Sequence, residues 1–269
     1  MTFGRSTGKV YTGPLLIVIL LVLSALDSSA QKSPYKAGEK VTYLIRYGPI
    51  HAGLATLELT ADTFASKKVL RSYFSGKTVG VADAIIRIRD VYESYMNPET
   101  ELPVKSVRNI QEGRYRKYNV VLFDHVTRRD SAILTSDLTG KHVVQKGIHD
   151  ILSCFYYFRK NYLARGYTFK NGEMITIMTW FTDELYPIKM VFAGTEEIKT
   201  KAGKIKCYKF NPVTEVGRLF KTNEDVSFWF SADNNYLPVQ IRFEIFVGAF
   251  TVDLLTYEGL VYPLDIKTK

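Results

Sequence analysis

The sequence is short of the residues and motifs that most catalytic and metal sites use. Its 269 residues include two cysteines and four histidines, His51, His125, His142 and His149. None of these histidines lies in an HExxH motif or pairs with another at the i, i+4 spacing of a helical zinc site. The chain also lacks a G-x-S-x-G elbow, a P-loop and a CxxC pair. We therefore expect no enzyme activity, no metal and no cofactor.

The scarcity of cysteine leaves two states open for Cys154 and Cys207. A disulfide is permitted if the protein is exported. Two buried free thiols fit equally well, because cysteine packs as a small apolar residue. The spacing of the two residues does not decide between these states.

Long hydrophobic runs are also scarce, and the one present lies near the N-terminus. Residues 14–26 are apolar, Arg5 and Lys9 precede them, and Ser28-Ser29-Ala30 follows as a small-x-small cleavage site. The run is shorter than the roughly 20 residues that span a bilayer comfortably. We predict a signal peptide at residues 1–30 and a mature chain with no transmembrane span. We expect it in the periplasm or associated with the outer envelope, and the alternative is an uncleaved N-terminal anchor.

The charge and the aromatic content narrow the class of protein. The net charge is +9, but the basic residues are scattered along the chain. For an exported protein we expect no nucleic-acid partner, whereas an anionic surface, an apolar ligand or an envelope protein remains open. Aromatic residues make up 13% of the chain, with 18 Tyr and 16 Phe, which favours β-structure.

One stretch of the sequence occurs twice. Residues 90–113 recur as residues 225–248 without a gap, at an offset of 135. Seven positions are identical, where about one or two are expected by chance, so we infer an internal duplication. The identical pairs are Asp90/Asp225, Val91/Val226, Leu102/Leu237, Pro103/Pro238, Val104/Val239, Ile110/Ile245 and Gly113/Gly248. We predict one duplicated domain over residues 31–269, with halves at about 38–125 and 172–259.

Alternating polar and apolar residues predict six strands in each half. The expected strands are 40–47, 53–61, 68–79, 84–96, 103–112 and 114–123, then 174–181, 188–200, 204–210, 219–230, 239–245 and 249–257. The fold class is therefore all-β and mainly antiparallel. Two six-stranded meanders would form a curved half-barrel or a sandwich, because twisted sheets of twelve strands tend to curl or split.

The connection at residues 126–171 has a different pattern and should carry the one substantial helix, at 150–165. Ile151, Phe155, Phe158 and Tyr162 follow a helical period. Asp150 can cap its N-terminus, and Gly166 can end it. A helix seated in a half-barrel would leave an apolar groove. The ligand-groove candidates are Phe155, Phe158, Tyr162 and Trp229, although an aromatic stripe of this kind is commoner as a core-packing face.

Four segments together resemble the bacterial domain-of-unknown-function family 3108, and the resemblance covers essentially the whole mature chain. They are GEKVTYLIRYGPIHAGLATLEL at 38–59, HDILSCFYYFRK at 149–160, YPIKMVFAGTEEIKTKAGKIKCYKFNP at 186–212 and FWFSADNNYLPVQIRFEIFVG at 228–248. The resemblance implies an exported, mainly β protein without an assigned activity, and it lends no catalytic residues.

Three functions remain open. The first is a non-enzymatic cell-envelope protein that binds a lipid or another apolar ligand in a groove. The second is a structural or adaptor protein of envelope assembly. The third is a hydrolase that uses Asp90 or Asp225 as a glycosidase-like acid or base. We favour structural roles for these aspartates, because a repeat retains what its fold needs.

Overall fold

The computed structural model describes residues 33–213, 226–244 and 248–267. Residues 33–269 cluster as one compact unit. The predicted signal peptide therefore lies outside the described residues, and so do Asp225 and residues 219–225 of the predicted strand 219–230.

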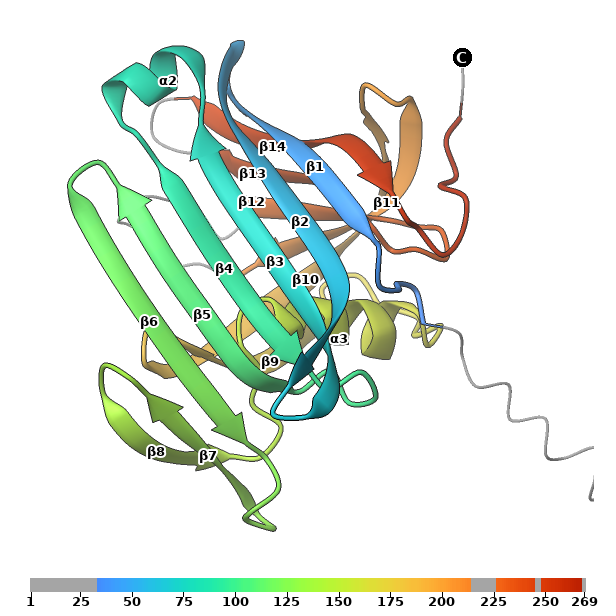
Figure 1. The fold of residues 1–269 in the computed structure, drawn as a ribbon. Helices are drawn as coiled ribbons and strands as arrows, with labels where there is room; N and C mark the ends of the chain where they lie inside the picture. The colour runs from blue at the N-terminus through green and yellow to red at the C-terminus, as the bar shows by residue number, and fades with distance from the viewer. Residues whose placement is uncertain (1–32, 214–225, 245–247, 268–269) are drawn as a thin grey trace, which may run out of the picture. The chain divides into compact units, whose positions relative to one another are not determined.

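The described residues form one antiparallel sheet of 14 strands, in the order β8-β7-β6-β5-β4-β3-β2-β1-β14-β13-β12-β11-β10-β9. Figure 1 shows this sheet turning back on itself, so that β9–β13 lie behind β2–β5. The strands are β1 Lys40–Tyr47, β2 Ile50–Phe64, β3 Lys67–Thr78, β4 Arg89–Met96, β5 Pro103–Glu112, β6 Tyr115–Asp124, β7 Ser131–Ser136, β8 Gly140–Gln145, β9 Met174–Phe181, β10 Glu184–Lys199, β11 Lys204–Pro212, β12 Val226–Ser231, β13 Pro238–Glu244 and β14 Ala249–Glu258. The mainly antiparallel β fold is confirmed.

Two sets of six strands, β1–β6 and β9–β14, follow each other in the same order. Matching strands begin 134 to 137 residues apart; the first pair begins at 40 and 174 and the fifth at 103 and 238. The two sets join where β1 pairs with β14, so they share one sheet instead of packing as two. A duplicated meander predicts this arrangement.

Two predicted elements differ from the structure. Residues 84–88 are not a strand: a short helix, α2 (Gly80–Ile85), precedes β4, and Ile86 is exposed. The side chain of Asp83 holds α2 in place through Arg89 and Thr78, an interaction that strand alternation does not reveal. The connection 126–171 is not only helical, because β7 and β8 extend the first edge of the sheet.

The two edges of the sheet approach each other after β8. The His149 backbone N–H donates to the Met178 carbonyl at 3.1 Å, and the Trp180 N–H donates to the His149 carbonyl at 2.7 Å. Trp180 of β9 packs in one cluster with Val121 of β6 and Leu134 of β7. The chain leaving β8 thus satisfies part of the free edge of β9, which would otherwise be open to pairing.

The predicted helix 150–165 is confirmed as helical at its centre. It consists of α3 (Ser153–Phe158) followed by one π-helical turn, η1 (Arg159–Leu163). Phe158 and Leu163 pack against an aromatic cluster from β9–β12, whereas Tyr156 packs against Leu59 of β2 and Met96 of β4. The helix therefore joins the two six-strand sets. Among the described residues, no helix is long and apolar enough to cross a membrane.

Candidate functional site

The N-terminus of α3 is held by a buried carboxylate. Asp150 Oδ1 accepts the backbone N–H groups of Leu152 and Ser153, both at 2.8 Å, as the sequence predicts for an N-cap. Its Oδ2 accepts the hydroxyl of Ser94 on β4 at 2.6 Å. Burial raises the pKa of Asp150 to about 6, against the opposing effect of these hydrogen bonds.

His149, the residue before Asp150, is also buried. Its Nδ1 lies 3.3 Å from Ser153 Oγ, and its ring lies 4.5 Å from the ring of Tyr157. Burial lowers the pKa of His149 to about 4, so the imidazole is neutral at pH 7. Ser153 is fully buried and Asp150 points to Ser94, so these three residues do not form a nucleophilic triad.

A second buried polar centre surrounds Arg159, the first residue of η1. Its guanidinium is fully buried and forms a two-point ion pair with Glu39, at 2.5 Å and 3.0 Å. Nη2 also donates to the Asn235 carbonyl at 2.8 Å. The Asn235 side chain in turn bonds both the N–H and the carbonyl of Tyr262. This centre links the start of β1, the helix, the β12–β13 turn and the C-terminal segment, which is a structural role.

Three of the four predicted groove residues, Phe155, Phe158 and Tyr162, pack in one interior cluster. Phe158 is buried among Phe210 and Phe230, and Phe155 stacks on Phe230 at 6.0 Å. Trp229 is buried in a neighbouring cluster, against which Phe155 also packs, and its Nε1 donates to Glu196 at 2.6 Å.

Tyr162 alone of the four lines one of the cavities described here. This cavity has a volume of about 330 Å³ and lies between the helix and β9, with His149, Tyr157 and Leu102 also in its wall. A role of the four residues in ligand binding stays a prediction. Their side chains mainly form the interior that joins helix and sheet.

Asp90 has a structural environment. Its Oδ1 accepts the backbone N–H of Gln111, on the neighbouring strand β5, at 2.9 Å. Burial, followed by the charge of Asp90, raises the pKa of the neighbouring Glu112. Asp90 lines none of the cavities described here. Cys154 and Cys207 are both buried free thiols.

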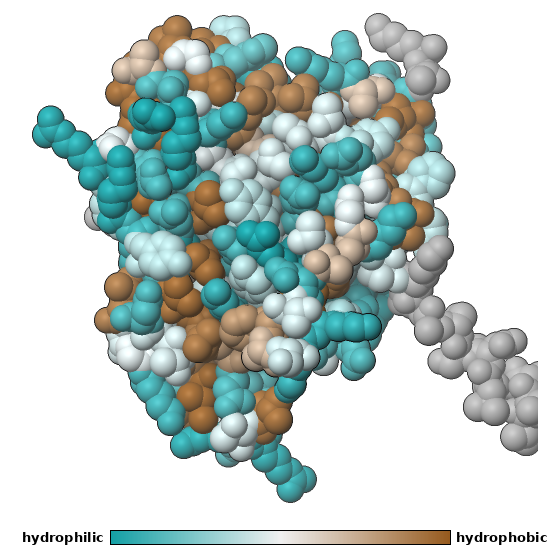
Figure 2. Space-filling model, in the orientation of Figure 1, coloured by the Kyte–Doolittle hydropathy of each residue, from teal (hydrophilic) through white to brown (hydrophobic). Residues whose placement is uncertain are grey.

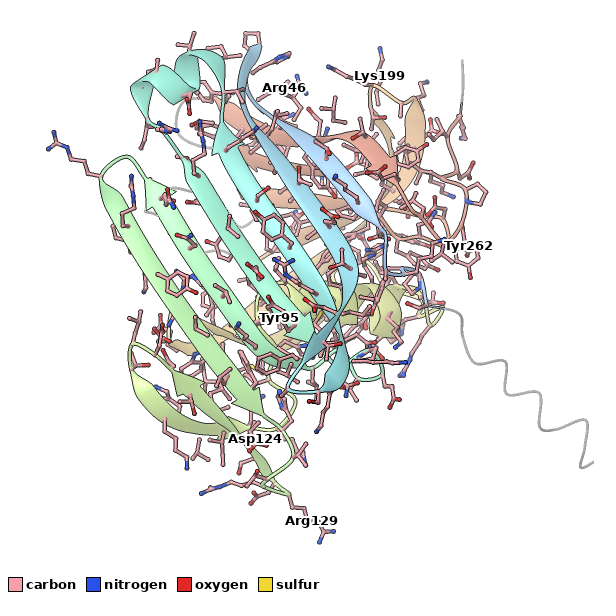
Figure 3. All side chains as sticks on the ribbon, viewed as in Figure 1. Arg46, Tyr95, Asp124, Arg129, Lys199 and Tyr262 are labelled. Carbon is pink, nitrogen blue, oxygen red and sulfur yellow. The ribbon has the colours of Figure 1, made fainter. Side chains whose placement is uncertain are left out.

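The largest of the cavities described here, called the large groove, lies at one end of the first six strands. Its volume is about 930 Å³. It crosses the β2–β3 hairpin, the β4–β5 turn and the start of the β6–β7 loop, and β7 and β8 complete one wall. Its apolar lining consists of Phe64, Ala65, Val69, Leu102, Val104, Leu122, Phe123, Val126 and Ile133. Figure 2 shows hydrophobic side chains gathered on the lower part of the visible face, and Figure 3 places Asp124 there, between Tyr95 and Arg129.

The charged residues of the large groove are mainly cationic. Lys67 and Lys141 are exposed in its wall. The ammonium of Lys105, on the neighbouring strand β5, lies over the rings of Phe64 and Tyr95 at 5.7 Å and 5.0 Å. Asp124 is the acidic residue in the lining, and its carboxylate accepts the backbone N–H groups of its own loop at Val126 and Thr127. Hydrogen bonds from that loop, Thr127 first, lower its pKa to about 2.

His125 is the buried polar side chain of the large groove. Its ring stacks on Phe123 with centroids 6.3 Å apart, and both ring nitrogens are buried without a partner that meets hydrogen-bond geometry. Burial, the larger effect, lowers its pKa, and the Pro103 carbonyl acts in the opposite direction. Both nitrogens are closed off from the open space of the groove, so the His125 ring contributes to the wall without offering a hydrogen bond to a ligand.

Sequence reasoning did not find the large groove. Its lining comes from five separate segments, and the sequence pattern predicts residues 126–145 as part of a helical connection. A signal was present in two short runs, residues 131–136 and 140–145, which contain apolar pairs and are separated by Asp137-Leu138-Thr139, a pattern typical of a hairpin. Among the described residues there is no group of three or more His, Cys, Asp or Glu side chains arranged to hold a metal ion.

Comparison with known proteins places the chain in a family. The family described as "Protein of unknown function (DUF3108)" matches residues 42–255. No curated protein matches this chain. A crystal structure from Brucella abortus, titled as a beta-barrel-like protein of domain of unknown function DUF1849, is similar with a TM-score of 0.53. Its sequence identity is 6%, and the match covers 83% of this chain and 98% of that one, so the similarity shows the fold alone.

Proposed function

We propose that this chain, which belongs to the DUF3108 family of proteins of unknown function, is an exported, non-enzymatic binding protein of the cell envelope. Its ligand is a single-chain anionic amphiphile, such as a fatty acid, held in the large groove. Export is supported by the pattern of residues 1–30, and a binding role by the lack of catalytic motifs in the sequence.

The apolar lining of the large groove carries this proposal. Ligand sites typically measure about 300–1,000 Å³ and combine an apolar wall with few polar groups. The groove, at about 930 Å³, has this composition. Each methylene removed from water contributes about 0.8 kcal/mol, so an acyl chain gains affinity from this lining without any directional contact.

The charges around the large groove select the head group. Lys67 and Lys141 stand in its wall with their ammonium groups toward water, where they attract an anion. Asp124 is engaged by its own loop, so the wall retains a cationic character.

Titration with a fluorescent long-chain fatty acid tests the proposal. The variant Leu122→Glu places a carboxylate in the groove wall, where it must lose water to admit an acyl chain. We expect at least about tenfold weaker binding, since such a burial costs well over 1.4 kcal/mol.

The matched control is Leu185→Glu on β10. Leu122 is 44% exposed and Leu185 is 46% exposed, both lie on strands, and Leu185 lines none of the cavities described here. The control should bind as the wild type does. Equal affinity of both variants, or no saturable binding by the wild type, would refute the proposal.

A further inference from the structure

The end of the sheet opposite the large groove carries an apolar projection. Here we call it the α2 tip, formed by Val81, Ile85 and Ile86 together with the β5–β6 hairpin at residues 113–116. Val81 is 68% exposed and Ile85 is 80% exposed, and α2 has no buried residue. Figure 1 shows α2 at the top of the view and β7 and β8 at the bottom, and Figure 2 shows brown side chains at that top end.

The fold fixes the α2 tip in this orientation. Asp83 receives two hydrogen bonds from Arg89, at 2.7 Å and 3.2 Å, and a third from Thr78 at 2.7 Å. The short helix therefore places its polar contacts toward the sheet and its isoleucine and valine toward water. Folding alone favours burial of the valine and isoleucine side chains. An apolar projection that hydrogen bonds hold in the exposed orientation therefore indicates a surface that a membrane or another molecule covers.

The hairpin beside α2 brings aromatic and cationic side chains to the same place. The Gly113 N–H donates to the Arg87 carbonyl at 2.9 Å, which sets the hairpin next to the end of α2. Arg114, Tyr115 and Arg116 follow and are all exposed, as is Arg87. Residues 77–90 and 110–118 contain six basic and three acidic side chains, a net charge of +3. Asp83 is paired with Arg89, and Asp90 accepts the Gln111 N–H.

We infer that the α2 tip docks on the surface of an anionic lipid bilayer. Aliphatic side chains that enter the acyl boundary, tyrosine at the interface and arginine at the head groups are the three features such a surface selects. Each Lys or Arg near an anionic leaflet contributes about fivefold to binding. The charge complementarity favours a bilayer over a second copy of this chain, which would bring the same cations together.

Binding to vesicles tests the inference, and it is independent of ligand binding in the large groove. The protein is mixed with vesicles of phosphatidylcholine alone or with added phosphatidylglycerol, and the bound fraction is measured by sedimentation. Residues 1–32 are the same in every variant, so they contribute equally to the baseline. The double variant Arg114→Glu/Arg116→Glu should bind anionic vesicles at least about 25-fold more weakly, the loss expected from removing two cations alone. The control Arg128→Glu/Arg129→Glu changes the same charge in the β6–β7 loop at the other end and should have a much smaller effect.

A second pair of double variants, one of them a matched control, tests the aliphatic part of the α2 tip. Val81→Ser/Ile85→Ser should weaken binding by roughly tenfold or more, since two exposed aliphatic side chains lose their transfer to the acyl boundary. Leu138→Ser/Val143→Ser removes two residues that are also more than half exposed, on the β7–β8 hairpin, and should leave binding unchanged. All four residues are exposed, so neither double variant should fail to fold.

A site-specific label locates the contact. Both native cysteines are buried, so an environment-sensitive fluorophore attaches to Val81→Cys or to the control Leu138→Cys. With anionic vesicles, the label at position 81 should shift to the blue and the label at position 138 should not. Equal shifts at both positions, no shift at position 81, or a shift without vesicles that grows with protein concentration would overturn the inference. The last result would indicate a second copy of the chain as the partner.

Discussion

Replacing Asp150 by asparagine should change how stability depends on pH. Burial raises the pKa of Asp150 from 3.8 to about 6 in the folded protein. The folded state therefore holds this proton more tightly than the unfolded state. The stabilisation that this bound proton gives the folded state is complete below pH 3.8 and is lost as the pH rises through 6. At 1.36 kcal/mol per pKa unit, the loss is about 3 kcal/mol.

His149 acts in the opposite direction over nearly the same range. Burial lowers its pKa from 6.5 to about 4, so its contribution is complete above pH 6.5 and is lost as the pH falls through 4. This loss also amounts to about 3 kcal/mol. The two residues together should leave the wild-type stability nearly flat between pH 4 and 6, and each single substitution should expose the effect of the other.

Urea unfolding at pH 4 and pH 7 measures this effect. The stability of Asp150→Asn relative to the wild type should improve by about 2–3 kcal/mol from pH 4 to pH 7, because the amide keeps the N-cap acceptor without a charge. His149→Gln should worsen by a similar amount relative to the wild type over the same interval. Taking differences from the wild type cancels the other titrating groups. Relative stabilities that stay constant within about 0.5 kcal/mol would refute the assignment of opposed buried groups.

Three further predictions follow from the buried centres and the groove. Glu39→Gln should cost about 3–5 kcal/mol in urea unfolding, because it leaves the Arg159 guanidinium buried without its counter-charge; Glu258→Gln, whose pair with Lys40 is exposed, should cost less than about 1 kcal/mol, and equal costs would contradict this. Cys154 and Cys207 should not react with a thiol reagent in the folded protein, since burial raises the pKa of Cys207 to about 12 and that of Cys154 further. Both thiols should react once the protein is unfolded. A missing pair of thiols after unfolding would indicate a disulfide. Lys67→Gln/Lys141→Gln should weaken binding of a fatty acid about 3–10-fold and leave the alcohol of the same chain length unaffected, and equal losses for both ligands would count against recognition of the head group.

The sequence predicted much of the sheet because its signals are local. The boundaries of β1 and β9 agree with the expected strands, and Pro103 opens β5 as a residue without an N–H should. Asp150 caps the helix through its neighbours at positions 152 and 153, a spacing that can be read from the chain. Residues 84–88 were assigned wrongly, because Ile86 and Ile88 alternate with arginines in a segment where the Asp83–Arg89 pair decides the conformation.

The candidate site depends on contacts that no local pattern contains. Phe64, Leu102 and Leu122 meet in the large groove although they are distant in sequence, and only the order of strands β2–β6 brings them together. Arg159 pairs with Glu39 across 120 residues. The helical period correctly indicated an apolar face at Phe155 and Phe158 but could not tell whether a ligand or the protein itself covers it. Phe158 is covered by aromatic side chains from β11 and β12.

Native mass spectrometry of the protein purified from the envelope tests whether the large groove holds an amphiphile in the cell. The wild type and Leu185→Glu should each carry one amphiphile, with a mass in the range of a single-chain anionic lipid. Leu122→Glu should be recovered without this ligand, because the new carboxylate lies in the wall of the large groove. A bare wild-type protein would contradict the account, and so would a ligand retained equally by Leu122→Glu.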